Sequence, residues 1–312
     1  MPLHLDHILT FANVLNVDNY VERYRMLGFD VTKETRPYKP GLRNRFIQFG
    51  CEYLELVWVE DEAAFNAGGH EEFARMFPDL PAIHQAARPF SVAFKTASVE
   101  ALHTEWTRAG YAVPEVWSFA PPDMPPILSF QTIPDSLLPG VSAFAITYHL
   151  NTPASEVRHV RPAVNTIYAL DGLTFASETP QKHAAQWGVL LNLSASVGEN
   201  DGVYEVAITP HTAWWMSPQI FQERYGVEYS PAPHHFGEIA AVHLLAENLN
   251  TATLRLGEYA VHQTHPVTNE PLLVVSPIGN DGVTYIIREY SIDQWQAERT
   301  RLTGEKIVLH HR

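Results

Sequence analysis

An internal repeat of predicted elements constrains the fold of this chain more than any other feature of its sequence. The first copy predicts a strand at 7–11, a helix from Asn16 that ends at Gly28, a strand at 29–32 and a hairpin over 42–57. The helix carries apolar residues at the i, i+3, i+4, i+7 spacing of a buried stripe, and glycine is typical just past a helix end. The first unit therefore has the order β-α-β-β-β.

A second copy of this order begins about 80 residues later, a distance that indicates a duplicated module rather than a solenoid repeat. It predicts strands at 90–95, 127–131 and 143–149, together with a helix that follows the first of them. Gly110 stands at the end of that helix, where Gly28 stands in the first copy. The first half of the chain is therefore predicted to be two joined modules.

Third and fourth copies are fainter and open with strands at 173–176 and 240–245. Four units predict an α+β protein in which paired βαβββ modules form curved, cup-shaped mixed sheets in two halves. We expect the first half at 1–155 and a second, more divergent half at 156–312.

The composition excludes several classes of partner. A formal charge of -14 argues against nucleic acid or an anionic membrane as the main partner, because both reward a basic surface. No apolar run reaches membrane-spanning length, and no signal peptide is recognisable. The single cysteine, Cys51, allows no internal disulfide and suits a reducing compartment. We therefore expect a cytoplasmic globular protein whose partner is a small molecule.

One histidine and one carboxylate on predicted strands carry the clearest chemical signal. The period of two places Tyr53, Glu55 and Val57 on one face of their strand, and it groups His7 with the apolar residues of its own strand. His7 and Glu55 are thus predicted to face each other across a concave sheet. They suit either a divalent metal site or acid–base chemistry, with Glu55 as a general base of raised pKa. The structural alternatives are a core histidine and a salt-bridged glutamate.

Two arginines precede Glu55 in the same predicted hairpin. Arg43 and Arg45 alternate with Asn44, so the two guanidinium groups share one face and Asn44 points the other way. If that face lines the cup, the arginines would bind a carboxylate or phosphate bidentately. The alternative is a solvated strand edge.

Taken in order, four short motifs resemble the glyoxalase-like branch of the vicinal oxygen chelate superfamily. The motifs are Leu5-Asp6-His7-Ile8, Leu27-Gly28-Phe29, Gly41-Leu42-Arg43-Asn44-Arg45 and Tyr53-Leu54-Glu55-Leu56. The resemblance implies two glyoxalase-like halves of paired βαβββ modules. It also implies a divalent metal (Zn, Mn, Fe or Ni) held by the first and last strands of each module.

Carried over residue by residue, the resemblance places His7 and Glu55 at the ligand positions of the first module. The second module departs from it, because Ser91 and Thr147 stand at the equivalent positions and neither is a usual ligand for these metals. A third ligand would have to be His149 or a histidine from elsewhere. Tyr53, Thr147 and His149 join the arginines as expected substrate contacts.

In the second half, His243 and Glu289 lie on the first and last predicted strands of the fourth module. They form a weaker metal-ligand pair, because the alignment puts Ala241 rather than His243 at the ligand position. A buried structural pair is the alternative.

The resemblance implies a metal-dependent lyase, isomerase or dioxygenase that acts on a small oxygenated molecule. The alternative is a metal-free protein of the same fold that binds and sequesters a small molecule. A further alternative makes the second half a degenerate partner that covers the cup or completes a homodimer. The sequence holds no glycine-rich phosphate loop, nucleophile elbow or CxxC motif, which disfavours nucleotide and covalent acyl chemistry.

Overall fold

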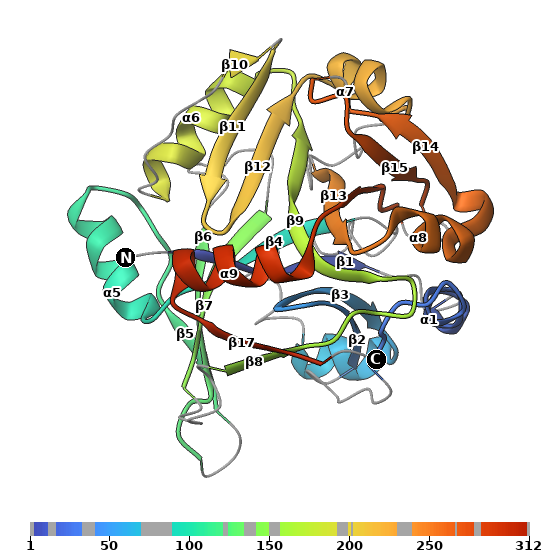
Figure 1. Ribbon diagram of the computed structural model, residues 1–312. Helices are drawn as coiled ribbons and strands as arrows, with labels where there is room; N and C mark the ends of the chain where they lie inside the picture. The colour runs from blue at the N-terminus through green and yellow to red at the C-terminus, as the bar shows by residue number, and fades with distance from the viewer. Residues whose placement is uncertain are drawn as a thin grey trace.

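The chain folds into two curved mixed sheets with helices packed against them, as the computed structural model shows (Figure 1). The predicted α+β architecture of paired modules in two halves is confirmed. None of the described helices is long and apolar enough to cross a membrane. The structure describes residues 3–11, 17–32, 41–69, 89–120, 124–133, 142–149, 157–191, 199–200, 202–229, 239–265, 267–277 and 282–310.

The first sheet has seven strands in the order β2-β3-β1-β4-β7-β6-β5. Its two central strands, β1 and β4, are antiparallel, and each pairs in parallel with the last strand of its own module, β3 or β7. The strand predicted at 29–32 is only an isolated bridge between Val31 and Ile47. The elements are β1 (His4–Phe11), α1 (Val17–Met26), β2 (Leu42–Phe49), β3 (Glu52–Val59), α2 (Glu62–Ala64), the π-helix Phe65–Gly69, β4 (Pro89–Lys95), α5 (Val99–Arg108), β5 (Trp117–Phe119), β6 (Leu128–Ile133) and β7 (Ser142–Tyr148).

The second sheet repeats this plan with eight strands in the order β10-β11-β12-β9-β13-β16-β15-β14. Again the central pair, β9 and β13, is antiparallel, and each strand lies parallel to the last strand of its module. The elements are β9 (Ile167–Ala176), α6 (Pro180–Leu190), β10 (Glu199–Asn200), β11 (Val203–Ile208), β12 (His211–Met216), α7 (Pro218–Tyr225), β13 (Ile239–Ala246), α8 (Leu249–Leu256), the 3-10 helix Gly257–Tyr259, β14 (Ala260–Thr264), β15 (Pro271–Val275) and β16 (Tyr285–Glu289).

A C-terminal segment follows the second sheet and pairs with the strand that precedes it. Helix α9 (Ile292–Thr303) follows the second sheet, and β17 (Lys306–Leu309) then pairs in parallel with β8 (Val157–Val160). In Figure 1, α9 crosses between the two sheets.

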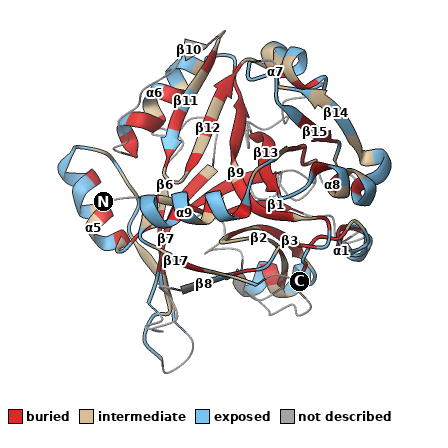
Figure 2. Ribbon diagram, in the orientation of Figure 1, coloured by how far each residue is buried: buried red, intermediate tan, exposed pale blue. Residues whose placement is uncertain are grey.

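The largest apolar cluster spans both halves. It joins the inward faces of α1, α5, α6 and α8 to the sheet faces beneath them, and the ring centroids of Phe94 and Trp187 lie 5.6 Å apart across the two halves. The buried residues run through the centre of the molecule in Figure 2, while the helices expose their outer faces. Each cup has its own smaller apolar cluster on the opposite face of its sheet.

A buried ionic cluster also links the halves. Glu52 begins β3, and its Oε1 lies 2.6 Å from Nη2 of Arg299 on α9 and 3.1 Å from Nε2 of His211 on β12. Burial alone would raise the pKa of Glu52, but the charges of Arg299 and His211 outweigh it and lower that pKa. Arg299 also donates from Nε to Glu305 at 2.8 Å. The cluster therefore depends on three separate parts of the chain.

We expect Glu52→Gln to lower the free energy of unfolding by about 3 kcal/mol at pH 7, because it leaves a buried arginine without its main counter-ion. Since the folded pKa of Glu52 is lowered, its stabilisation is present above the unfolded pKa and is lost as pH falls through the folded value. Urea unfolding at pH 7 and pH 3 measures both effects.

The matched control is Glu60→Gln, which removes a half-exposed partner of Arg43 and should change stability by less than about 1 kcal/mol. An equal loss in the two variants would contradict a bridging role for the buried cluster.

Candidate functional site

The candidate site lies on the concave face of the first sheet, where β1 and β3 run side by side. Their parallel register pairs His7 with Tyr53 and Leu9 with Glu55. The His7 and Glu55 side chains point toward each other, with Nε2 of His7 3.5 Å from Oε2 of Glu55. Both residues are buried, at 3% and 4% exposed. The structure thus brings together the two residues that the strand period places in one cup.

Asp6 completes a line of polar groups behind His7. Its Oδ2 lies 2.7 Å from Nδ1 of His7 and accepts a hydrogen bond of 2.7 Å from the Tyr148 hydroxyl. Strict alternation would put Asp6 and His7 on opposite faces, but the pairing of β1 with β4 shifts register between Leu5 and His7. Burial raises the pKa of Asp6, yet the hydrogen bond and charge of His7 outweigh it, so this pKa is lowered. Asp6 therefore fixes the orientation of the imidazole.

Asn44 holds the other end of the line. Its Nδ2 donates to Oε1 of Glu55 at 2.8 Å, which leaves Oε2 of Glu55 toward His7. Burial raises the pKa of Glu55, and the opposing effects of His7 and Asn44 do not cancel that increase. A carboxyl group of raised pKa holds a proton more readily than an ordinary glutamate, as a general base requires.

Aromatic rings enclose the imidazole. The Tyr53 ring stacks on His7 with centroids 4.6 Å apart and planes 11° apart, and Phe144 meets His7 edge-on at 5.7 Å. The Tyr53 and Tyr148 hydroxyls lie 3.4 Å apart, and burial raises the pKa of both. Tyr53 thus lies directly against the His7 ring on the concave face.

The arginines do not line this cup. The β2–β3 register places Asn44 and Phe46 on the face of Glu55, so Arg43 and Arg45 lie on the opposite face. Arg43 donates from Nε to Glu60 at 2.5 Å. Burial and the charge of Arg25 on α1 lower the pKa of Arg45. The two arginines do share a face, as their spacing predicts, but that face is opposite to Glu55 and cannot present them to a substrate anion in the cup.

Thr147 and His149 also lie on the helix side of their sheet. The Thr147 hydroxyl accepts the Val99 backbone N–H at the start of α5, and Ser129 Oγ lies 2.7 Å from Nε2 of His149, which is exposed. Tyr148, between them, is the residue of this strand that faces Asp6. The structure therefore does not bring Thr147 or His149 to the His7–Glu55 pair.

The described donors do not complete a divalent metal site. His7 Nε2 and Glu55 Oε2 are close enough to bind one ion, and a carboxylate on Nδ1 is common behind a metal-binding histidine. A catalytic site normally has about three protein ligands, however, and no group of three His, Cys, Asp or Glu side chains converges within the described ranges. Ser91, the residue aligned with His7, has a buried Oγ without a hydrogen-bond partner there. Among the described His, Cys, Asp and Glu side chains, His7 and Glu55 are therefore the two placed to bind a metal in this cup.

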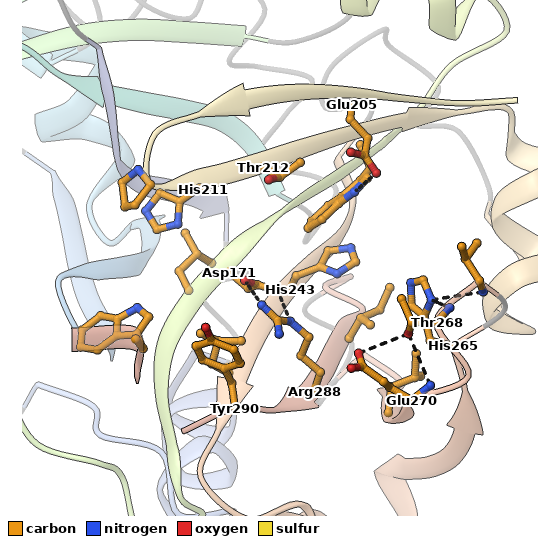
Figure 3. Close-up of a pocket in the computed structure, with 18 of the residues that line it drawn as sticks. Asp171, Glu205, His211, Thr212, His243, His265, Thr268, Glu270, Arg288 and Tyr290 are labelled. Atoms are coloured by element: carbon orange, nitrogen blue, oxygen red, sulfur yellow. Dashed lines mark hydrogen bonds and ion pairs between the residues drawn. The ribbon is translucent and has the colours of Figure 1, made fainter. Parts of the chain in front are cut away.

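The second half contains an open cavity of about 450 Å³ on the concave face of its sheet. His243 lies in its wall, and the close-up in Figure 3 shows it beside the Asp171–Arg288 pair. Glu289 does not join it, because its Oε2 accepts the Leu249 N–H at the start of α8, on the other face. The expected His243–Glu289 ligand pair is therefore wrong, and Arg288 takes the cup-facing position of β16.

Known proteins share this fold. A family model described as a glyoxalase-like domain matches residues 5–191, more than half of the chain. No curated protein sequence matches. Similar solved structures include a hypothetical protein from Staphylococcus aureus, with a TM-score of 0.56 and 12% identity over 93% of this chain and 100% of that one. The Mn(II)-bound glyoxalase from Novosphingobium aromaticivorans has a TM-score of 0.54 and 11% identity over 99% and 87%. A catechol 2,3-dioxygenase has a TM-score of 0.54 and 10% identity over 93% and 89%.

We expect Glu55→Gln to raise the free energy of unfolding at pH 8 by on the order of 1 kcal/mol, because burying the charged carboxylate costs stability. The folded pKa of Glu55 is raised, so stability is highest below the unfolded pKa and falls as pH rises through the folded value. The gain should therefore shrink toward pH 4. Thermal unfolding across this range measures it.

Glu52→Gln provides the contrast within the same strand, because the pKa of Glu52 is shifted in the opposite direction. A loss of stability in Glu55→Gln at pH 8 would show that the His7 contact outweighs burial.

Proposed function

Because the chain belongs to the family of glyoxalase-like domain proteins in the vicinal oxygen chelate superfamily, we propose that its first cup binds a small oxygenated molecule and moves a proton on it. The observation that carries the proposal is the 3.5 Å approach of His7 Nε2 to Glu55 Oε2, with Asp6 bonded behind the imidazole. A base and a second proton carrier side by side are the minimum that proton transfer between neighbouring carbon and oxygen atoms needs.

Glu55 is the proposed base. Its Oε2 takes a proton from a carbon beside a carbonyl group, and the electrons of the broken C–H bond move onto the carbonyl oxygen. His7, which Asp6 holds at Nδ1, lies with Nε2 beside Glu55 and relays the proton between that carboxyl group and the oxygen. Return of the proton to the neighbouring carbon completes an isomerisation, and loss of a leaving group completes a lyase reaction. Asn44 keeps Glu55 aligned throughout.

A metal-dependent reaction on the same pair is the second candidate. The carboxylate behind His7 favours it, since this arrangement raises the basicity of a metal-binding imidazole. The proposed proton transfer does not use a metal, because only two of the described side chains, His7 and Glu55, are placed to bind one. The third candidate, a metal-free protein that sequesters its ligand, shares the cup but performs no chemistry.

Solvent exchange tests the proposed reaction on a panel of candidate substrates. Small 2-hydroxy and 2-oxo carbonyl compounds are incubated in D₂O with the protein, and deuterium incorporation beside the carbonyl is followed by NMR. We expect Glu55→Gln to slow the exchange at least about 100-fold, the usual contribution of a general base. Asp6→Asn should slow it less, because the imidazole stays in place.

Arg43→Gln is the matched control, because this side chain lies on the other face of the hairpin and should leave the exchange rate unchanged. Exchange that persists in Glu55→Gln would rule out Glu55 as the base. Ligand binding without any exchange would instead support the sequestering protein.

Elemental analysis of protein purified without chelators distinguishes the metal-dependent reaction from the other two candidates. If His7 and Glu55 are the only metal-binding side chains in the described part of the site, we expect less than one metal ion per chain. A stoichiometric metal that is lost in His7→Ala would instead support the metal-dependent reaction, with His7 as a ligand.

A further inference from the structure

The cavity of the second half has the size and shape of a small-molecule site. Its volume of about 450 Å³ falls within the range of ligand pockets, roughly 300–1,000 Å³. It follows the concave face of the second sheet, from α9 at one end to the exposed segment 267–270 at the other. No residue of the His7–Glu55 line contributes to its wall. It is therefore a second cup with its own lining.

Flat and apolar groups form part of its wall. The Trp214 and His243 rings lie 4.4 Å apart at 39°, and the Leu272 and Ile286 side chains are buried beside them. Burial lowers the pKa of His243 to about 3, so its ring is uncharged at physiological pH. The Trp214 indole N–H already donates to Glu205 at 3.2 Å. Trp214, which is half-buried in this wall, is thus the aromatic surface available to a planar ligand.

A fixed hydrogen-bond donor stands in the same cavity. Arg288 donates from Nε and Nη2 to the two oxygens of Asp171 at 2.7 and 2.8 Å, and its guanidinium lies 4.8 Å from the Tyr290 ring centroid. Figure 3 shows this bidentate pair near the middle of the wall. Nη1 has no hydrogen-bond partner within the described ranges. It can therefore donate to an oxygen of a bound molecule without any rearrangement.

The charges of the wall disfavour an anion. Asp171 neutralises Arg288, and Arg299 is engaged with Glu52 and Glu305. The third arginine of the wall, Arg224, is not free either. Three more carboxylates line the cavity, at Glu205, Glu270 and Glu298. An anionic ligand would meet these carboxylates without an uncommitted cation in the described wall.

From this combination we propose that the second cup is a binding site for a small uncharged aromatic molecule that carries a carbonyl or hydroxyl oxygen. The aromatic ring packs on the wall formed by Trp214 and its apolar neighbours, and the oxygen accepts from Nη1 of Arg288. The site is independent of the chemistry proposed for His7 and Glu55.

Benzamide and benzoate test the proposal, because they share one shape and differ in charge. Isothermal titration calorimetry of the full chain should show benzamide binding at least about tenfold more tightly than benzoate. Trp214→Leu should weaken benzamide at least about tenfold, and Trp214→Phe should recover most of the loss because it restores a ring. Glu55→Gln should leave the binding unchanged.

Asp171→Asn is the most direct test of the charge argument. It keeps the shape of the wall but leaves the charge of Arg288 without its counter-ion, so the ratio of benzoate to benzamide affinity should rise by about tenfold or more. Thermal unfolding of each variant verifies that it is folded.

The proposal is overturned by the absence of benzamide binding at millimolar concentration, by tighter binding of benzoate to the unmodified protein, or by an unchanged preference in folded Asp171→Asn. Loss of binding in Glu55→Gln would place the ligand in the first cup instead, so the two sites are tested separately.

Discussion

The parallel pairing of the first strand of a module with its last strand is the constraint on which this molecule depends. It sets β1 beside β3 and β9 beside β12, although a helix and other strands separate them along the chain. The pairing brings residues that are distant in sequence onto one concave face. It also leaves the opposite face of each sheet to the helices, where the shared apolar cluster forms. Both cups and the contact between the halves follow from it.

Much of this arrangement was predictable from the sequence. The order of elements, the paired modules and the approach of His7 to Glu55 follow from the two-residue period and the internal repeat. Asp6 was not predictable in this way, because a register shift in β1 breaks the alternation at that point. For the two arginines, the two-residue period predicts only that they share a face; it does not predict which face lines the cup. The strand register answers this, because it places Asn44, and not the arginines, on the same face as Glu55.

The two cups solve the burial of polar groups differently. In the first, Asp6 and Asn44 hydrogen-bond to His7 and Glu55, and these four side chains are buried. In the second, the polar groups pair at the wall and leave open volume between them. Sequence patterns identify residue types on a face, but open volume depends on side-chain size and packing across several strands. The cavity therefore emerged only from the structure.

The salt bridge between Glu52 and Arg299 has a consequence for biosynthesis. Glu52 leaves the ribosome with the first module, whereas Arg299 follows only after the strands of both sheets have been made. Before α6 has been made, the helix side of the first sheet also lacks Trp187, which packs on Phe94 in the finished protein. The nascent first half thus exposes apolar surface and an unpaired acid while translation continues, a state in which chaperones commonly bind. The buried ion pair between the halves can therefore form only after α9 has been made.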